Sequence, residues 1–110
     1  MSSNPLIALE NEAEQLKVDG KYDEAIAKLE EVLSLDDKYV RAYMALSVLY
    51  HKKEEYVKSV EFAEKAVELE PEDPFNHSAL SVMCQRAFEG TKDPVFIQKA
   101  EDAMAKSRGM

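Results

Sequence analysis

The chain has 110 residues, of which 45% are hydrophobic and 33% charged, and its formal net charge is −8. This length fits a single globular domain with a packed core, residues 1–110. The acidic balance argues against nucleic acids and anionic membranes as partners, because both bind basic surfaces, and it favours a protein partner, in particular a basic one.

The negative charge is concentrated in the first third of the chain. Residues 1–39 carry 10 acidic and 4 basic side chains, residues 40–73 carry 8 and 5, and residues 74–110 carry 4 and 5, so the three segments have charges of −6, −3 and +1. An acidic beginning and a near-neutral end favour head-to-tail self-contact. Ordinary solvated helix faces explain the same pattern without any partner.

No secretory or membrane-spanning pattern is found. The N-terminus lacks the basic, apolar and small-residue order of a signal peptide, and the longest nearly apolar run, residues 43–50, is too short to cross a bilayer. The single cysteine, Cys84, has no partner for an internal disulfide. A cytoplasmic protein is therefore expected.

The first predicted helix begins at Asn4 and Pro5. Asparagine is a good N-cap, and proline fits the first helical position because it lacks only an N–H that would be unpaired there. The helix is expected to run to about Val18, with Gly20 as its stop.

Three further helices follow with similar lengths. They are expected at about residues 22–35, 38–52 and 55–70, each with apolar residues at three- and four-residue intervals. Asp36 and Asp37 are expected to end the second helix and to cap the third.

The last hairpin departs from this spacing. Asp73 and Pro74 repeat the cap-then-proline pattern and open a fifth helix that is expected to end at Phe88. A three-residue insertion within Glu89–Lys92 predicts a longer loop before a final helix that starts at Asp93 and Pro94.

Apolar positions recur every 34 residues, so that Tyr22 corresponds to Tyr56 and, in the first helices, Leu9 corresponds to Tyr43 and His77. Repeats are therefore expected at about residues 6–39, 40–73 and 74–108. The stretch Tyr43-x2-Leu46-Ser47-x2-Tyr50, followed by Ser59-x3-Ala63, Ala66 and Pro71, resembles the tetratricopeptide repeat signature. The resemblance extends from about Leu6 to the end of the chain. It implies an all-α fold, a right-handed α-solenoid of three helix-turn-helix repeats and six helices.

Small residues and one acid have expected places in such a stack. Ala13, Ser47 and Ser81 are expected where the first helix of each pair approaches its partner closely. Glu12 stands where the later repeats have Leu46 and Leu80. An acid is tolerable there because the first repeat has a face without a neighbour.

The family resemblance also implies where a partner binds. In this family the first helix of each pair lines a concave surface, and bound peptides lie across it. The positions that this implies are Glu10, Glu14, Arg41, Met44, Ala45, Val48, His51, Phe75, Ser78, Ala79, Val82, Gln85 and Arg86. The centre of this groove is apolar, and apolar patches rimmed by polar groups often bind partners.

The family's best-known groove clamps the C-terminal carboxylate of a partner with basic and amide side chains. Here the corresponding positions carry Glu10, Glu14, Ala45, Phe75 and Ala79, so an acidic chaperone tail would be repelled. Glu10 and Glu14 lie on one helical face and suit a basic residue of a ligand. Simple solubility explains them equally well.

Catalytic and metal-binding patterns are absent. The chain has two histidines and one cysteine and no H-E-x-x-H, C-x2-C or glycine-rich phosphate motif. His77 and Cys84 lie on one helical face, yet both occupy positions that are normally core, so a buried imidazole and a buried thiol are favoured over a site. Neither a cofactor nor a metal is expected.

These observations predict a non-catalytic protein–protein interaction module that presents a concave, centrally apolar groove to a peptide or helix of another protein. One alternative is a homo-oligomeric scaffold that assembles through its groove or its exposed terminal repeats. The other alternative, from a different class, is a small metal carrier or enzyme that uses His77 and Cys84.

Overall fold

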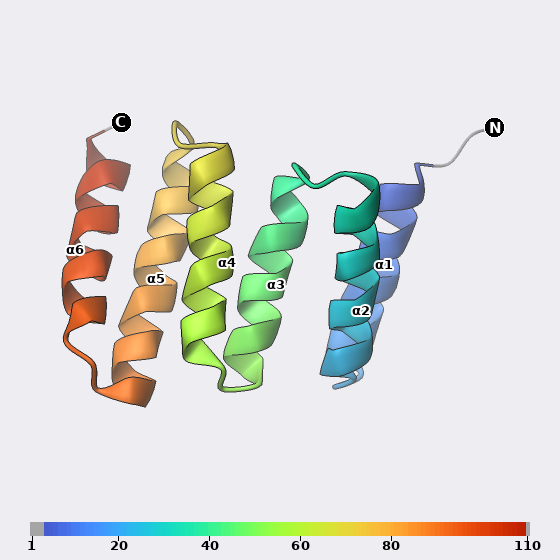
Figure 1. Cartoon of the computed structure of the whole chain (residues 1–110), viewed down its shortest axis with the longest axis horizontal. Helices are drawn as coiled ribbons and strands as arrows, with labels where there is room; N and C mark the ends of the chain where they lie inside the picture. Colours follow the sequence, from blue (N-terminus) through green and yellow to red (C-terminus); the bar gives the residue numbers. More distant parts are fainter. Residues whose placement is uncertain (1–3, 110) are drawn as a thin grey trace.

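The computed structural model describes residues 4–109. These residues form six helices and no strand. The helices are α1 (Pro5–Val18), α2 (Tyr22–Leu35), α3 (Val40–Lys52), α4 (Tyr56–Leu69), α5 (Pro74–Thr91) and α6 (Val95–Arg108). They stand in chain order as three hairpins in an elongated body of 47 × 29 × 19 Å (Figure 1). The predicted all-α solenoid of three hairpins is confirmed.

Two of the helices begin with the predicted caps. The side-chain oxygen of Asn4 accepts a hydrogen bond from the backbone N–H of Leu6 at 2.9 Å, and Asp73 accepts one from Phe75 at 2.9 Å. The predicted cap on α3 is wrong, because Tyr39 occupies the N-cap position without a side-chain cap bond. Asp36 instead accepts from the backbone N–H of Lys38 at 3.0 Å, which stabilises the loop before α3.

Small side chains allow the two helices of a hairpin to approach closely. The Ser47 hydroxyl donates to the backbone carbonyl of Ser59 at 2.7 Å, and the Ser59 hydroxyl donates to the carbonyl of Ser47 at 2.8 Å. Both serines are buried. In the third hairpin the Ser81 hydroxyl donates to the carbonyl of Ala100 at 2.9 Å. The predicted close contacts at Ser47 and Ser81 are therefore confirmed, and both serines also form hydrogen bonds across their hairpins.

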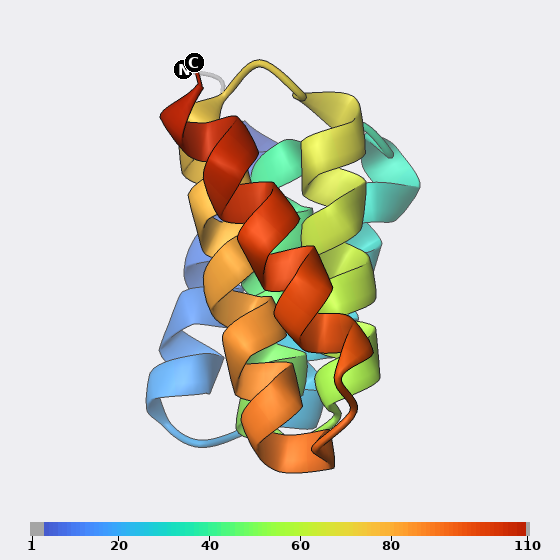
Figure 2. The ribbon, with the colours of Figure 1, turned by 90° about the vertical axis from the view of Figure 1, so that its left-hand side faces the viewer.

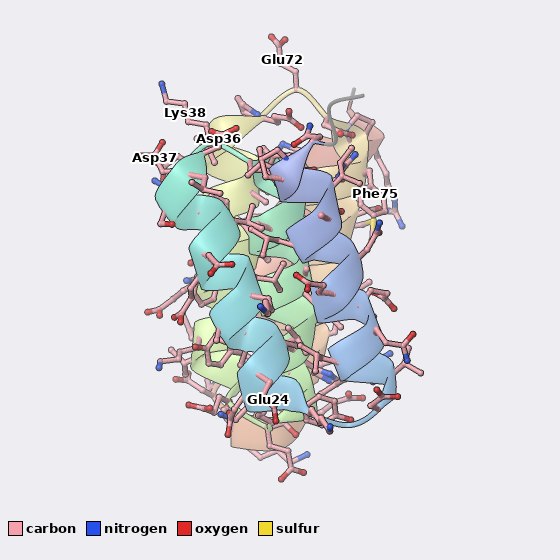
Figure 3. All side chains as sticks on the ribbon, turned by 90° about the vertical axis from the view of Figure 1, so that its right-hand side faces the viewer. Glu24, Asp36, Asp37, Lys38, Glu72 and Phe75 are labelled. Atoms are coloured by element: carbon pink, nitrogen blue, oxygen red, sulfur yellow. The ribbon has the colours of Figure 1, made fainter. Side chains whose placement is uncertain are left out.

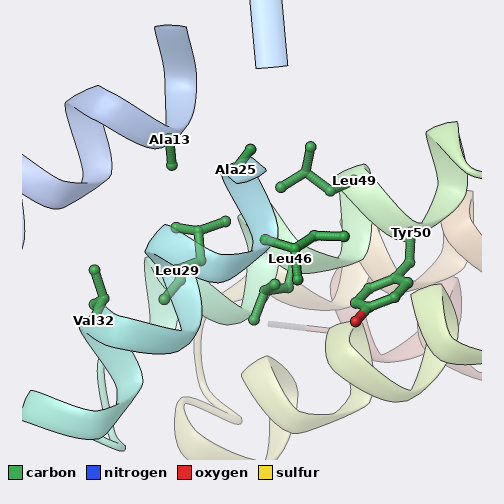
Figure 4. Packing of buried hydrophobic residues seen from close by; sticks show 9 residues of the cluster. Ala13, Ala25, Leu29, Val32, Leu46, Leu49 and Tyr50 are labelled. Carbon is green, nitrogen blue, oxygen red and sulfur yellow. The ribbon is translucent and has the colours of Figure 1, made fainter. Parts of the chain in front are cut away.

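Larger apolar side chains fill the seam between the first two hairpins. Leu29 from α2 and Leu46 and Leu49 from α3 are each 1% exposed, and Figure 4 shows them between the helices. Ala13, Ala25, Val32 and Tyr50 belong to the same cluster. Burial of this apolar surface holds one hairpin against the next.

The loops between hairpins are held by equivalent side chains with different chemistry. The Tyr43 hydroxyl donates to the backbone carbonyl of Asp37 at 2.7 Å. One repeat later, His77 Nε2 lies 2.6 Å from the carbonyl of Pro71, so this nitrogen carries the proton and donates. Both side chains are buried. His77 is therefore a structural residue that fixes the loop before α5.

The insertion in the third repeat lengthens a helix, and the predicted long loop is wrong. Helix α5 continues to Thr91 and has 18 residues, whereas α3 has 13. The five additional residues form more than one helical turn, so α5 contains the whole three-residue insertion. The turn ends at Lys92, whose φ of 62° is left-handed.

Gly90 in this added turn lies directly against the ring of Tyr56, the first residue of α4. A Cβ atom at position 90 would overlap that ring. The Tyr56 ring also contacts His51, whose ring centroid lies 5.8 Å away in an edge-to-face arrangement. The added turn therefore joins α5 to the turn between α3 and α4.

Gly90→Ala tests this contact. Alanine favours a helix by about 1 kcal/mol over glycine, but displacement of the Tyr56 ring is expected to reverse that gain and lower the unfolding free energy by about 1–3 kcal/mol. In a Tyr56→Ala background the same change should increase stability. Urea denaturation of the four proteins measures both effects, and a Gly90→Ala protein more stable than wild type would contradict the contact.

Replacement of His77 tests the loop contact. His77→Leu should lower the unfolding free energy by about 1 kcal/mol, because the hydrogen bond to the Pro71 carbonyl is lost. His77→Tyr should retain most of the stability, since tyrosine makes the equivalent bond at position 43. If tyrosine proves as harmful as leucine, the equivalence of the two loops is refuted.

The pKa of His51 is lowered, first by burial and then by the positive charges of Arg86 and Lys52. The folded protein therefore favours the neutral ring, while the unfolded chain takes up a proton more readily as the pH falls. The stability contribution of the neutral ring is complete above the ordinary histidine pKa and is lost as the pH falls through that value to the lowered one.

Unfolding free energies of the wild type and His51→Gln from about pH 8 to about pH 5 test this expectation. Stability should fall more steeply with acidification in the wild type, and the His51 ring resonance should titrate below its ordinary pKa. Parallel curves for the two proteins would show that His51 is not responsible.

Candidate protein-binding groove

A groove of about 510 Å³ runs along the side of the molecule formed by α1, α3 and α5. Helices α1 and α5 lie on this side and α2 and α4 on the other, as Figures 2 and 3 show from the two ends. The residues that line the groove are Glu10, Asn11, Ala13, Glu14, Lys17, Leu29, Met44, Ala45, Val48, Leu49, Phe75, Ala79, Val82 and Met83.

Eight of the residues predicted from the sequence line this groove. They are Glu10, Glu14, Met44, Ala45, Val48, Phe75, Ala79 and Val82. Arg41 lies in an adjoining hollow, which also includes Glu10, Met44 and Phe75. The structure therefore brings the central apolar positions of α3 and α5 together with the acidic positions of α1.

Four of the predicted residues lie elsewhere. The Ser78 hydroxyl is 3.3 Å from that of Ser107 on α6, so it belongs to the third hairpin's own contact. Gln85 lines a separate hollow between α5 and α6. His51 packs against Tyr56, and Arg86 acts on His51 rather than lining the groove.

The groove is deeper than the sequence predicted. Ala13, Leu29, Leu49 and Met83 occupy core positions, yet their edges form part of its lining. The edges of these side chains are accessible because the groove extends between the helices of neighbouring hairpins. No sequence signal marks this opening, because it depends on how far apart two hairpins lie.

The apolar centre of the groove is open to solvent. The side chain of Phe75 is 67% exposed and that of Val82 is 38% exposed, while Met44, Ala45 and Val48 are half-buried. In Figure 3 Phe75 projects on the α1 side of the molecule. A segment that covered these side chains would remove apolar surface from water, which is favourable at about 25 cal/mol per Å².

The carboxylates at the edge of the groove, Glu10 and Glu14, already have partners within the chain. The Tyr39 hydroxyl donates to Glu10 Oε1 at 2.6 Å, and the Arg41 guanidinium donates to the same oxygen at 3.0 Å. The hydrogen bond to Glu10 is the main reason why the pKa values of Tyr39 and Arg41 are both raised. Glu14 pairs with Lys17 at 3.2 Å.

The one cysteine of the chain is unsuited to nucleophilic chemistry. Cys84 is fully buried, and burial is the first cause that raises the pKa of its thiol to about 11. A thiol in this state is a poor nucleophile and a poor metal ligand. Within residues 4–109, no three histidine, cysteine, aspartate or glutamate side chains are grouped to hold a metal ion.

The helices of residues 4–109 also lack a candidate membrane span, since none combines sufficient length with sufficient apolar character.

Solved structures resemble this chain over nearly its whole length. The globular C-terminal domain of LpoP from P. aeruginosa matches with a TM-score of 0.81 at 16% identity, covering 94% of this chain and 98% of that one. The second TPR of Spaghetti (RPAP3), solved bound to the HSP90 peptide SRMEEVD, matches with a TM-score of 0.76 at 15% identity, covering 96% and 91%. At these identities the likeness shows the fold alone.

MamA from Desulfovibrio magneticus RS-1, solved from residue 41 to its end, matches with a TM-score of 0.73 at 27% identity. The match covers 96% of this chain and 58% of the MamA chain, so this chain spans little more than half of that structure. No curated protein sequence is significantly similar to the chain.

The sequence matches the family profile described as Tetratricopeptide repeat over residues 19–81. This match covers more than half of the 110 residues and agrees with the three hairpins of the structure. The chain therefore belongs to the tetratricopeptide repeat family.

Proposed function

We propose that the groove between α1, α3 and α5 binds an apolar segment of another protein, either a peptide or one face of a helix. The observation that carries this proposal is the open apolar strip of Met44, Val48, Phe75 and Val82. Repeats of this fold commonly present such concave surfaces to partners. The chain acts in this proposal as an interaction module without chemistry of its own.

The electrostatics favour a ligand that binds mainly through apolar contacts. A basic ligand group at the α1 edge would have to replace Arg41 or Lys17 as the partner of Glu10 or Glu14. Exchange of one surface ion pair for another gives little free energy. The affinity should therefore come from the side chains that enter the strip, with a basic residue adding at most a small increment.

An acidic ligand fits less well. The RPAP3 repeat was solved with a peptide that contains two glutamates and ends in aspartate. In this chain the α1 edge carries Glu10 and Glu14, and Ala45 and Ala79 offer no charged donor to a carboxylate. A terminal carboxylate placed here would lose water without gaining a partner.

The wider roles remain predictions. A role as a scaffold or adaptor in the cytoplasm is consistent with a chain that binds other proteins. Self-association is a second candidate function, and the outer face of α6 at one end of the molecule gives a specific reason for it.

Val48→Glu tests the proposal. Peptides selected from a random display library against the wild-type chain provide the probe, and their dissociation constants are measured by fluorescence anisotropy. Val48→Glu should weaken binding by at least about tenfold, because a carboxylate would lie in the apolar strip. Circular dichroism should remain unchanged.

Val57→Glu is the matched control, since Val57 lies on α4, is 53% exposed and does not line the groove. The affinity of Val57→Glu for the selected peptides should equal that of the wild type. The affinity should also vary little with salt concentration, whereas a ligand held by charge would bind more weakly as salt is added. If the selected peptides bind Val48→Glu as well as the wild type, the groove is not their site.

A further inference from the structure

The outer face of α6 carries an exposed apolar side chain at a position that is buried in the other two hairpins. Ile26 on α2 and Val60 on α4 are 6% and 1% exposed, because each packs in a core cluster. The corresponding residue of α6, Ile97, is 43% exposed. Met104, two turns further along the helix, lies on the same face as Ile97.

This face forms one side of a hollow between α5 and α6. The hollow has a volume of about 470 Å³, and its lining includes Ser81, Gln85, Ile97, Glu101, Met104 and Arg108. Figure 2 shows α6 as the front helix at this end, with no other described helix across it. In the first two hairpins the equivalent side is covered by the next hairpin, so the third hairpin has apolar surface without a neighbour.

The opposite end of the molecule has a different surface. The hollow between α1 and α2 combines the charged side chains of Glu12, Glu24 and Lys28 with Gln15 and the apolar Leu16 and Ala27, and Lys28 lies 3.9 Å from Glu12. Glu24 is labelled at this end in Figure 3. Stacking of the α6 face onto this end would place Glu101, as well as Ile97 and Met104, against an end that carries Glu12 and Glu24, and Arg108 is the one cation in the lining of the α6 hollow that could pair with these carboxylates. Head-to-tail stacking therefore compensates fewer charges than a contact between two α6 faces.

The charges on the α6 face match a second copy of the same face. Glu101 and Arg108 are seven residues apart on one side of α6, on either side of Met104, and neither forms an ion pair within residues 4–109. In an antiparallel pair of α6 helices, Glu101 of one copy approaches Arg108 of the other. A parallel pair would instead bring like charges together.

The overall charge distribution also favours self-association through α6. Residues 74–110 carry 4 acidic and 5 basic side chains, a net charge of +1, whereas residues 1–39 carry 10 and 4, a net charge of −6. Two copies that meet through α6 therefore keep their acidic first repeats apart.

We propose that two copies of this chain form a symmetric dimer in which the outer faces of their α6 helices pack antiparallel, with Met104 near the two-fold axis. Such an interface is isologous, because the same surface is used twice. The groove between α1, α3 and α5 lies on a different face, so the dimer presents two grooves. A ligand with two apolar segments would then bind with increased apparent affinity.

Sedimentation velocity of the 110-residue chain over a concentration series tests the proposal. The wild type should shift from its monomer mass of 12.4 kDa toward twice that value as concentration rises. Met104→Glu should remain a monomer, because a buried carboxylate would face its own copy near the axis. Val57→Glu, an exposed residue on α4, should dimerise like the wild type.

Charge exchange provides a second measurement that does not depend on an apolar substitution. Glu101→Arg and Arg108→Glu should each weaken dimerisation, and the double variant should restore it, because the pair forms between copies.

A wild type that stays monomeric at all concentrations, or a Met104→Glu protein that still dimerises, would overturn the proposal. Loss of the dimer in Val48→Glu, with no effect of Met104→Glu, would assign self-association to the groove instead. Peptide binding by Met104→Glu separates this proposal from that of the groove, since it should be retained whether or not the dimer forms.

Discussion

The close approach of the two helices within each hairpin determines how the rest of the chain packs. Ser47 and Ser59 exchange hydroxyl-to-carbonyl hydrogen bonds at 2.7 and 2.8 Å, so larger side chains do not fit at this point of contact between α3 and α4. The larger apolar residues, such as Leu29 and Leu49, therefore lie between hairpins. Because one hairpin cannot bury these residues alone, the hairpins must stand in a row.

A row of hairpins leaves two kinds of surface. One side, formed by α1, α3 and α5, keeps the apolar strip around Val48 and Phe75 accessible. The ends differ in their charges, because Glu12, Glu24 and Lys28 line the hollow at the first end while Glu101 and Arg108 flank Met104 at the last end. The same repeat pattern therefore produces a groove along its length and, at the α6 end, the exposed Ile97 on which the proposed dimer depends.

The sequence predicted the helices better than it predicted the groove. Asn4 and Asp73 cap α1 and α5 as expected, because capping is a local interaction between neighbouring residues. The positions of Met44 and Val48 also follow from local periodicity. Ser78 was placed on the groove by the same reasoning, but α6 lies close enough to pair its hydroxyl with that of Ser107. Periodicity assigns a residue to a face of its own helix and does not say which neighbour covers that face.

The sequence by itself determined the number and order of the helices, the 34-residue repeat and the small residues at which paired helices meet, because these follow from spacing along one chain. Only the tertiary structure decided that Glu89–Thr91 extend α5, since a loop and an added helical turn have the same length in sequence and the Tyr56 ring against Gly90 selects the turn. Tertiary structure likewise decided that the groove reaches Leu29 and Leu49 and that Arg41 neutralises Glu10. These features depend on distances between residues that are far apart in the chain, and local periodicity contains no information about such distances.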